Sequence, residues 1–473
     1  MDSPATPTQP RDDQPTEPAH PRRKGGAAKW LKNILRWGIA VVGVWYVLSQ
    51  MAFSDKILVA TPNGAQQMTL AEQNATEDQP TYRVIGEAAP VPHDRVLNKP
   101  AKKKETVTLK NGSVVSLLGL DLAGDLVHNP RVQRLYVQPS NQPPRWVTPA
   151  DLAAPYVLKV PYPRVDVGVA ALIRQASQKN LWKLVIAILI FPITFMLGAI
   201  RWHELLKALD IHIGLALTFT LNMVGAFYNT FMPGSTGGDV LKALYVSHLT
   251  VHRTRAVMSV LIDRIIGLIA LIIIGSIAAA TQWRVPQCRH IAIVSFALLG
   301  ATAAGLLVFY QPTLRKIFLL DWIINRMPMQ KQVQNAVKVM DIYGKRPGLV
   351  LLALVVTFPV HATVIMSAMF AGMAFGLPLP AGYYWAIVPV IVLVGSLPIS
   401  PQGAGVMEYF AIRLTETRGA TVSQAFALTM SIRLVQIFWN LTGAYFVMRG
   451  HFHKPGAAEE AEFKDDLNQN VGA

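Results

Sequence analysis

Six ionisable side chains interrupt long apolar stretches in the second half of this 473-residue chain: Asp239, Lys242, Asp263, Arg264, Glu408 and Arg433. A charged group at the centre of a bilayer costs at least about 2.5–3.5 kcal/mol on insertion scales, so such a residue is a candidate functional group. Lysine and arginine in this setting attract phosphate and other anions, whereas a carboxylate can exchange a proton or hold a sodium ion. The residue types therefore predict an anion-binding site, with acidic groups available for ion coupling.

Four of these residues also have a structural interpretation. Asp239 and Lys242 lie three residues apart, where they can pair on one helix face or act as a helix cap and a snorkelling cation. Asp263 and Arg264 either contact a lipid head group or tie their helix to a neighbouring element through an ion pair. The sequence leaves these alternatives open.

The remaining ionisable groups lie in other apolar stretches. Glu408 and Arg433 either neutralise each other across the bundle, or Arg433 holds a phosphate while Glu408 titrates. His361 also interrupts an apolar run. We expect a hydrogen-bonded structural histidine there rather than a proton carrier.

Two glycine-rich breaks separate apolar runs and read alike, FMPGSTGGDV at 231–240 and SLPISPQGAGV at 396–406. Helix-breaking backbone at membrane depth is tolerated only where it is buried in protein or lines a cavity, because lipid offers no hydrogen-bond partners. We expect each break to open a half-helix, at 239–249 and at 406–415. Polar and glycine residues at the breaks either contact a ligand or serve the interrupted backbone: Asn222, Asn229, Ser235, Gly237, Gly238, Ser400, Gln402, Gly403 and Gly405.

The composition predicts a polytopic membrane protein, because 52% of the residues are hydrophobic and only 15% are charged. The net charge of +16 gives little reason to expect nucleic-acid binding, since the lysines and arginines cluster beside the apolar spans. Cys288 is the only cysteine and has no metal-ligand spacing around it, so neither a disulfide nor a zinc site is available. We expect no metal and no cofactor.

Basic residues beside the spans orient the chain in the membrane by the positive-inside rule. The domains that we expect are a disordered cytoplasmic tail at 1–28, a first transmembrane helix at 29–53, a β-rich extracytoplasmic insertion at 54–165, a transmembrane domain at 166–448 and a disordered cytoplasmic tail at 449–473. Within the insertion, ETVTLKNGSVVSL at 105–117 predicts a hairpin with a type I′ turn at Asn111 and Gly112.

Threading the basic loops through a bilayer gives six full spans, at 29–53, 181–200, 256–280, 291–309, 349–376 and 421–447. The segments 211–249 and 383–415 contain the breaks and fit re-entrant hairpins better than pairs of full spans. They enter from opposite faces. The predicted fold class is therefore an all-α polytopic membrane protein with about six full spans, two opposed re-entrant hairpins in an inverted repeat, and a small β-rich extracytoplasmic insertion.

Three motifs in order carry a family resemblance. FYNTFMPGSTGGDVLKALYV, VLIDRIIGLIAL and LPISPQGAGVMEYF together resemble the flippase-like transmembrane region of lysylphosphatidylglycerol synthases and its free-standing relatives. The resemblance covers about 165–448 and implies that lipids or lipid-linked glycans are moved between leaflets. Lys242 stands where an arginine is expected, and Pro401, Gln402 and Met407 also depart from the pattern.

The expected function is translocation of an anionic phospholipid or a polyprenyl-phosphate-linked glycan across the inner membrane, with both termini cytoplasmic. Half-helix dipoles at the two breaks, Lys242 and Arg433 would hold the anionic head group near the midplane. We expect no enzyme, because P-loop, HExxH and GxSxG patterns are absent and about 25 residues after the last span leave no room for an aminoacyl-transferase domain. Residues assigned to substrate binding are Asn229, Ser235, Gly237, Gly238, Asp239, Lys242, Asp263, Arg264, Ser400, Gly403, Gly405, Glu408 and Arg433.

Two alternatives remain open at this point. The chain is either an integral membrane transferase that acts on a lipid-linked substrate, with Asp121 and Asp125 as metal or acid–base groups, or a non-catalytic assembly factor. In the second case, the insertion at 54–165 would bind an envelope protein.

Overall fold

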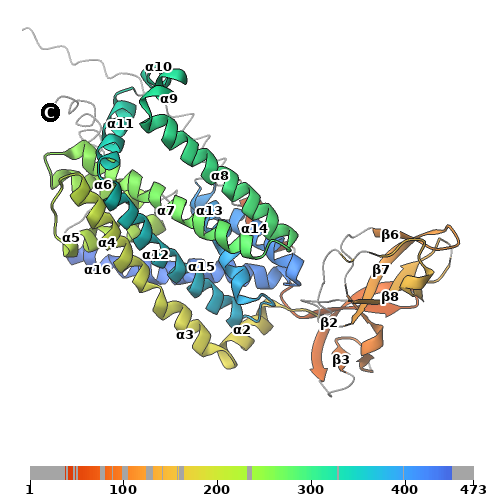
Figure 1. Cartoon of the computed structure of the whole chain (residues 1–473). Coiled ribbons are helices and arrows are strands. Elements are labelled where there is room, and N and C mark those ends of the chain that lie inside the picture. Colours follow the sequence, from red (N-terminus) through yellow and green to blue (C-terminus); the bar gives the residue numbers. More distant parts are fainter. Residues whose placement is uncertain are drawn as a thin grey trace, which may run out of the picture.

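The computed structural model combines a β-sheet region near the N-terminus with a larger helical region, and Figure 1 places the sheets beyond α2 at one end of the helices. The structure describes residues 38, 41–45, 48–49, 52–74, 80–87, 89–98, 105–123, 131–140, 142–156, 158, 165–231, 237–326, 330–397 and 399–449. The expected tail at 1–28 lies outside these residues, as do the expected tail at 449–473 except for Arg449 and most of the first expected span.

The helical region follows the apolar stretches of the sequence closely. Its helices are α2 (Val169–Gln178), α3 (Leu181–Ile190), α4 (Pro192–Ala208), α5 (Leu215–Phe231), α6 (Gly237–His248), α7 (Arg253–Thr281), α8 (Pro286–Tyr310), α9 (Pro312–Ile317), α10 (Leu320–Arg326), α11 (Gln330–Gly344), α12 (Pro347–Ala374), α13 (Ala381–Ser396), α14 (Val406–Thr415), α15 (Val422–Leu441) and α16 (Gly443–Arg449).

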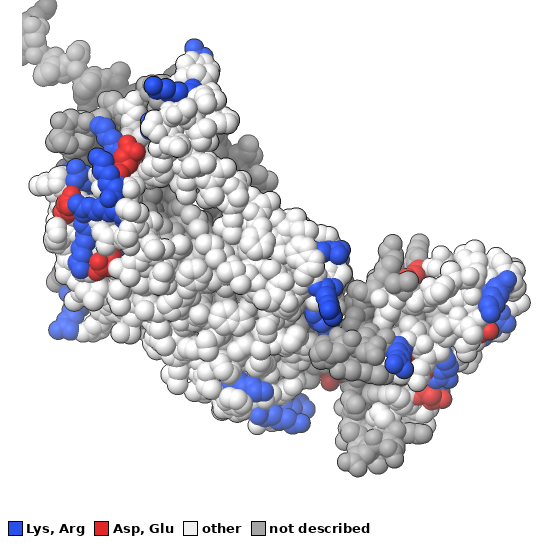
Figure 2. All heavy atoms as spheres, in the orientation of Figure 1, with Lys and Arg blue, Asp and Glu red and all other residues white. Residues whose placement is uncertain are grey.

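Four helical stretches among the described residues are long and apolar enough to cross a membrane, where six full spans were expected: Leu181–Ala208, Arg253–Thr281, Pro286–Tyr310 and Pro347–Ala374. The first of them joins α3 and α4. The last expected span, at 421–447, instead forms α15 and α16. Figure 2 agrees with a membrane setting, since a broad uncharged band on this face separates the lysines and arginines at its two ends.

Each glycine-rich break lies within a helix–break–helix unit. The first unit is α5 and α6, which pack antiparallel, so that Gly225 lies opposite Gly238 and Asn222 lies opposite Lys242. The second unit is α13 and α14 joined through a 3-10 turn at Pro401–Gly403. In this turn Gln402 has a φ of 49°, a left-handed conformation that costs a non-glycine residue energy.

Gly238→Ala should destabilise the first unit, because a Cβ at this position would overlap the backbone carbonyl of Gly225. The backbones of α5 and α6 would have to separate, and overpacking of this kind costs about 1–3 kcal/mol. Thermal unfolding in detergent micelles measures the effect. Gly300→Ala is the matched control, since a Cβ on this α8 glycine meets nothing within 4 Å. Equal melting temperatures for the two variants would contradict the close packing.

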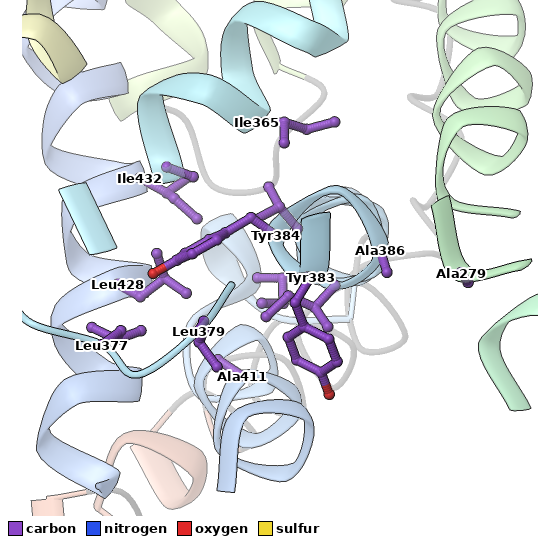
Figure 3. Close-up of a cluster of buried hydrophobic side chains, with 14 of the residues drawn as sticks. Ala279, Ile365, Leu377, Leu379, Tyr383, Tyr384, Ala386, Ala411, Leu428 and Ile432 are labelled. Carbon is purple, nitrogen blue, oxygen red and sulfur yellow. The ribbon is translucent and has the colours of Figure 1, made fainter. Parts of the chain in front are cut away.

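The second unit is anchored in the largest buried apolar cluster of the helical region. Tyr383 and Tyr384 of α13 are fully buried there. Figure 3 shows Tyr384 directed toward Leu428 and Ile432 of α15. The hydroxyl of Tyr383 donates a hydrogen bond of 2.7 Å to the carbonyl of Leu414 in α14. These contacts hold the two halves of the second unit and α15 in a fixed arrangement.

The β-sheet region contains two antiparallel sheets. Its strands are β1 (Lys56–Thr61), β2 (Gly64–Asn74), β3 (Thr81–Val84), β4 (Val91–Pro92), β5 (Val96–Leu97), β6 (Glu105–Thr108), β7 (Val114–Ala123), β8 (Arg131–Gln138), β9 (Arg145–Val147) and β10 (Val165–Asp166). The first sheet has the order β10-β1-β2-β3-β4 with β5 paired to β1, and the second has the order β6-β7-β8-β9. The predicted β-rich character of this segment is confirmed.

The predicted hairpin at 105–117 is present, but the predicted type I′ turn is wrong. β6 and β7 pair with Thr108 opposite Val114, and the amide of Leu109 donates to Ser113 O, so the loop is longer than two residues. Gly112 has a positive φ while Asn111 does not, whereas a type I′ turn needs both. The side chain of Asn111 instead accepts hydrogen bonds from the backbone and hydroxyl of Ser113, which favours the wider turn.

Both ends of the β-sheet region are tied to the same place on the helical region. Asp55 accepts a hydrogen bond of 2.7 Å from the amide of Gly168, and the amide of Val169 donates to Ala52 O. Ser423 at the start of α15 exchanges two hydrogen bonds of 3.2 Å with the backbone of Ala52. The sheets are therefore inserted between two adjacent points, next to α2 and α15.

Arg346 closes the C-terminal end of α4 on the side of the molecule that carries α11. Its guanidinium donates to the carbonyls of Lys207 and Ala208, and forms an ion pair of 2.9 Å with Asp210. A cation at this position satisfies carbonyls that have no partner within the helix. The hydrogen bond from Arg346 holds the pKa of the Asp210 carboxyl below its usual value.

Asp210→Asn should lower the melting temperature slightly at neutral pH, and the difference from the wild type should disappear in acid. Because the pKa is lower in the folded state, the ionised carboxylate stabilises the fold above its ordinary pKa of 3.8. That stabilisation is lost as the pH falls through the lower folded-state value. Melting curves of both proteins across this range test the prediction, and a difference that does not change with pH would contradict it.

Candidate functional site

Two neighbouring cavities lie between the helix–break–helix units. The larger has a volume of about 320 Å³ and the smaller about 180 Å³. Thr194, Phe195, Asn229 and Val360 line both of them. The larger cavity extends toward the second unit and α15, and the smaller one lies against the first unit. Together they form an interior space of the helical region whose mostly apolar lining carries several charged and amide side chains.

A buried cluster of charges borders the smaller cavity. Asp263 of α7 accepts a hydrogen bond of 2.7 Å from Arg201 Nε and lies 3.6 Å from Lys242 Nζ. Lys242 is only 3% exposed, donates 3.1 Å to Asn222 Oδ1, and stands 3.7 Å above the ring of Trp202. Four helices thus meet at one carboxylate and two cations. The ring face stabilises the ammonium group by a cation–π contact.

The charges of α6 and α7 pair crosswise. Lys242 meets Asp263, and Asp239 meets Arg264 with 2.8 Å between Oδ2 and Nη1. Each side chain of this second pair is about 30% exposed, and Arg264 lines the larger cavity. Asp239 and Lys242 therefore do not simply pair with each other, although their spacing allows it. Asp263 and Arg264 thus form ion pairs that tie α7 to α6, which matches the structural alternative given for them.

A third ion pair belongs to the second unit. Arg433 Nη1 of α15 lies 2.6 Å from Glu408 Oε1, and Glu408 is only 1% exposed. The other carboxylate oxygen of Glu408 accepts a hydrogen bond of 2.7 Å from the amide of Gly405, which precedes α14. The two side chains neutralise each other, as one of the alternatives predicted. Arg433 also lines the larger cavity.

The two units repeat one arrangement of acid and arginine. Asp239 and Glu408 are each the third residue of a half-helix. Arg264 follows Asp239 by 25 residues, and Arg433 follows Glu408 by 25 residues. In both units a side-chain oxygen also accepts a backbone N–H at the half-helix start: Asn229 accepts from the amide of Gly238, and Glu408 accepts from the amide of Gly405. One amide at the start of each half-helix is therefore already bound by the protein itself.

The second break meets the end of α5 at the cavity wall. Gln402 of the second break donates a hydrogen bond of 2.8 Å to the carbonyl of Thr230, the penultimate residue of α5. Asn440 of α15 donates to the Thr230 hydroxyl at 2.9 Å. On the other side of the second break, a Cβ on Gly405 would come within 2.7 Å of the Gly43 backbone, so the described part of the first expected span packs against it. Gly405 also has a φ of 80°, which requires glycine.

His361 of α12 also faces this interior. Its Nε2 lies 2.8 Å from the carbonyl of Gly267 in α7, and the side chain lines the larger cavity. A hydrogen bond of this length satisfies one ring nitrogen through the protein itself. The expected structural, hydrogen-bonded histidine matches this geometry.

Five of the residues expected at the site line the two cavities: Asn229, Asp239, Lys242, Arg264 and Arg433. Asp263 and Glu408 do not line them but form ion pairs with Lys242 and Arg433, and Gly238 packs against Gly225. Gly237 begins α6. Ser400, Gly403 and Gly405 belong to the second break but lie behind the cavity wall, where Ser400 is 3% exposed. Ser235 lies outside the described residues.

Arg201 and Thr194 are site residues that the sequence pattern missed. Arg201 was assigned to the cytoplasmic end of the span at 181–200, but α4 continues to Ala208 and directs Arg201 inward to Asp263. The signal was present in the amphipathic run IRWHELLKAL, which continues the helix past the arginine. Thr194 lines both cavities, and its buried hydroxyl has no hydrogen-bond partner among the described residues.

The acidic residues proposed for a transferase do not form a free pair. Asp121 is 4% exposed and accepts two hydrogen bonds, of 2.8 and 2.9 Å, from Arg134 of β8. Asp125 lies outside the described residues. The described part of the chain also holds no group of three or more His, Cys, Asp or Glu side chains placed to bind a metal ion. The Asp121 carboxylate is therefore engaged by an arginine rather than free to bind a metal ion or a substrate.

Comparison with known proteins agrees with this architecture. The family model described as the lysylphosphatidylglycerol synthase TM region matches residues 160–443, which is more than half of the chain, so the chain belongs to this family. The chain is also 19% identical over 307 residues to the UPF0104 membrane protein PH1989 of Pyrococcus horikoshii. That alignment covers 60% of this chain and 91% of the relative. The expected resemblance is confirmed, and the chain is a multi-pass membrane protein.

Proposed function

From its membership of this family, we propose that the protein moves a lipid with an anionic head group, either an anionic phospholipid or a lipid-linked glycan, between the leaflets of a cell membrane. The head group enters the cavities between the two units, while the acyl or prenyl chains remain in the surrounding lipid. The protein carries out transport rather than a chemical reaction. No covalent step is assigned to any residue.

One observation carries this proposal. The larger cavity is lined by Arg264 and Arg433, and each arginine is held in place by a carboxylate behind it. An arginine can exchange a carboxylate partner for a phosphate, because both anions accept the same bidentate hydrogen bonds. The volume of about 320 Å³ suits a head group and lies in the roughly 300–1,000 Å³ range of ligand pockets. A head group that crosses this cavity therefore meets two arginines that can hydrogen-bond its phosphate in passing.

The equal spacing of acid and arginine in the two units supports an inverted repeat. In this arrangement the units are re-entrant hairpins that enter from opposite faces, and the head group passes between their tips. The basic end of the helical region, which includes Lys207, Arg255 and Arg346, faces the cytoplasm by the positive-inside rule. The β-sheet region is then extracytoplasmic, and both termini are cytoplasmic.

Lipid exchange in reconstituted vesicles tests the proposal. Vesicles with fluorescent phosphatidylglycerol in both leaflets are treated with a membrane-impermeant quencher, and the fraction of quenched lipid is followed. We expect only the outer-leaflet pool to be lost without protein, and nearly the whole pool to be lost with it. Arg264→Gln should slow the exchange by about tenfold, because a hydrogen bond between charged groups is worth about 1.5–3 kcal/mol.

Arg413→Gln is the matched control for this experiment. Arg413 lies in α14 of the second unit, but its side chain is 57% exposed and pairs with Glu416 on the surface. Its exchange rate should equal that of the wild type. Protein that exchanges none of several anionic lipids would overturn the proposed function and favour a non-catalytic assembly factor. The transferase alternative is not favoured, because Asp121 is already paired with Arg134.

A further inference from the structure

The charges around the two cavities do not cancel. Within the described residues that line or adjoin the cavities there are four cations and three carboxylates: Arg201, Lys242, Arg264 and Arg433, with Asp239, Asp263 and Glu408. Asp239 neutralises Arg264, and Glu408 neutralises Arg433. The excess of one positive charge remains where Arg201 and Lys242 share the single carboxylate of Asp263.

This excess charge borders the smaller cavity. Arg201 and Lys242 both line the space of about 180 Å³, and their side chains are 11% and 4% exposed. A buried charge without a counter-charge is costly, so this pair favours an anion in the space beside it. Thr194 lines the same space, and its buried hydroxyl has no hydrogen-bond partner among the described residues. The volume equals roughly six water molecules at about 30 Å³ each, which is room for a phosphate group.

The larger cavity has a different chemical character. Its two arginines are paired with carboxylates, and side-chain amides of Asn229, Gln402, Gln436 and Asn440 line it. An amide offers both donors and an acceptor, as hydroxyl groups do. Gln402 and Asn440 each use the NH₂ end of the amide in a hydrogen bond to Thr230. This lining matches a neutral head group that carries hydroxyls.

We propose that the substrate is a phosphodiester lipid of net charge −1 whose phosphate binds beside Arg201 and Lys242, and whose hydroxyl-bearing head group occupies the larger cavity. This inference rests on the proposed function and adds the substrate class. Phosphatidylglycerol and a lipid-linked sugar phosphodiester share this chemistry. A zwitterionic lipid fits less well, because its ammonium group would lie among cations that already outnumber the carboxylates.

A comparison of the exchange rates of two lipids tests the charge of the site. Fluorescent phosphatidylglycerol and phosphatidylcholine are assayed in separate vesicle preparations with the same protein. We expect the wild type to move phosphatidylglycerol about tenfold faster or more, as a charged hydrogen bond worth about 1.5–3 kcal/mol predicts. Lys242→Gln removes the excess charge, so the ratio of the two rates should fall close to one. Lys242→Arg keeps the charge and should keep the preference.

Lys207→Gln is the matched control for charge. Lys207 lies in α4 like Arg201, but its side chain is 44% exposed and pairs with Glu204. Its lipid preference should equal that of the wild type. If Lys242→Gln does not fold, Asn222→Leu removes the hydrogen bond that holds the ammonium group and should lower the same ratio. An unchanged ratio in a folded Lys242→Gln or Asn222→Leu protein would overturn the assigned phosphate position.

A second comparison tests the hydroxyl-bearing head group. Phosphatidylethanol has the charge of phosphatidylglycerol but lacks its hydroxyls. We expect Gln436→Leu to slow phosphatidylglycerol while phosphatidylethanol keeps its wild-type rate, and equal slowing of both lipids would overturn the assignment of the larger cavity. Wild-type protein that moves none of the lipids would refute the proposed function itself. Wild-type protein that moves all of them at one rate would refute only the substrate class.

To distinguish a phospholipid from a lipid-linked sugar, the same vesicles are prepared with a prenyl-linked sugar phosphodiester. Preferential movement of this lipid over phosphatidylglycerol identifies the glycan as the substrate. The opposite preference identifies the phospholipid. In both cases Lys242→Gln should reduce the rate, and a variant that moves the preferred lipid at the wild-type rate would overturn the shared phosphate site.

Discussion

Arg433→Leu should lower the free energy of unfolding by about 3–5 kcal/mol, the cost of leaving one partner of a buried ion pair alone. Glu408 is only 1% exposed, and Arg433 supplies the 2.6 Å contact that balances its charge. The carboxylate also holds the amide of Gly405, so a displaced Glu408 would loosen the start of α14. Denaturant or thermal unfolding in detergent micelles measures the loss.

A double variant separates the charge effect from simple loss of packing. Glu408→Gln combined with Arg433→Leu leaves no unbalanced charge, and the amide oxygen of glutamine can still accept the Gly405 hydrogen bond. We expect the double variant to be more stable than Arg433→Leu alone. It should nevertheless exchange lipid slowly, because the cavity has lost one of its arginines. A double variant no more stable than the single one would show that the ion pair is not what holds α14 to α15.

Asp263→Asn should produce a loss of similar size, about 3–5 kcal/mol, because it leaves two buried cations without their common carboxylate. Arg201 and Lys242 have side chains that are 11% and 4% exposed, so water cannot replace the lost charge. The repulsion between them acts in a medium of low effective dielectric constant. Unfolding in detergent micelles again measures the effect.

Two further variants make this prediction specific. Asp239→Asn removes a carboxylate from a pair whose side chains are about 30% exposed, so it should be clearly less destabilising than Asp263→Asn. Lys242→Met added to Asp263→Asn removes one of the two cations and should recover part of the lost stability. Equal destabilisation by Asp239→Asn and Asp263→Asn would mean that the burial of Arg201, Lys242 and Asp263 does not set the size of the stability loss.

The breaks show which parts of the architecture are readable from local sequence. The glycines and prolines at 231–240 and 396–406 predicted the ends of helices near those positions, and α5, α6, α13 and α14 end or begin there. This works because a helix stop depends on the φ and ψ preferences of a few consecutive residues. The expected count of six full spans was less reliable. Helix length alone does not separate a span from a shorter packed helix such as α15, whose arginine and amide residues face neighbouring helices.

The β-sheet region gives a second example of this limit. The alternating segment at 105–117 predicted two strands joined by a turn, where β6 and β7 are found. The order of the strands and the insertion point beside Ala52 and Gly168 were not predicted. Strand pairing joins residues far apart in the chain, so a local pattern carries little information about it. Whether Asp121 is ion-paired likewise depends on Arg134 of a neighbouring strand.

Residue types and their depth in apolar stretches were sufficient to select Asp239, Lys242, Asp263, Arg264, Glu408 and Arg433 as candidates, because burying a charge in a membrane is costly wherever it occurs. The partner of each charge was settled by packing. Pairing within one helix depends on spacing, which allowed Asp239 to meet Lys242, but the close contact of α6 with α7 offered each of them a partner on the neighbouring helix. Arg201 was recognised only when the length of α4 brought it to Asp263. A sequence therefore identifies charges that need a partner, while the partner and the resulting excess charge follow from how the helices pack.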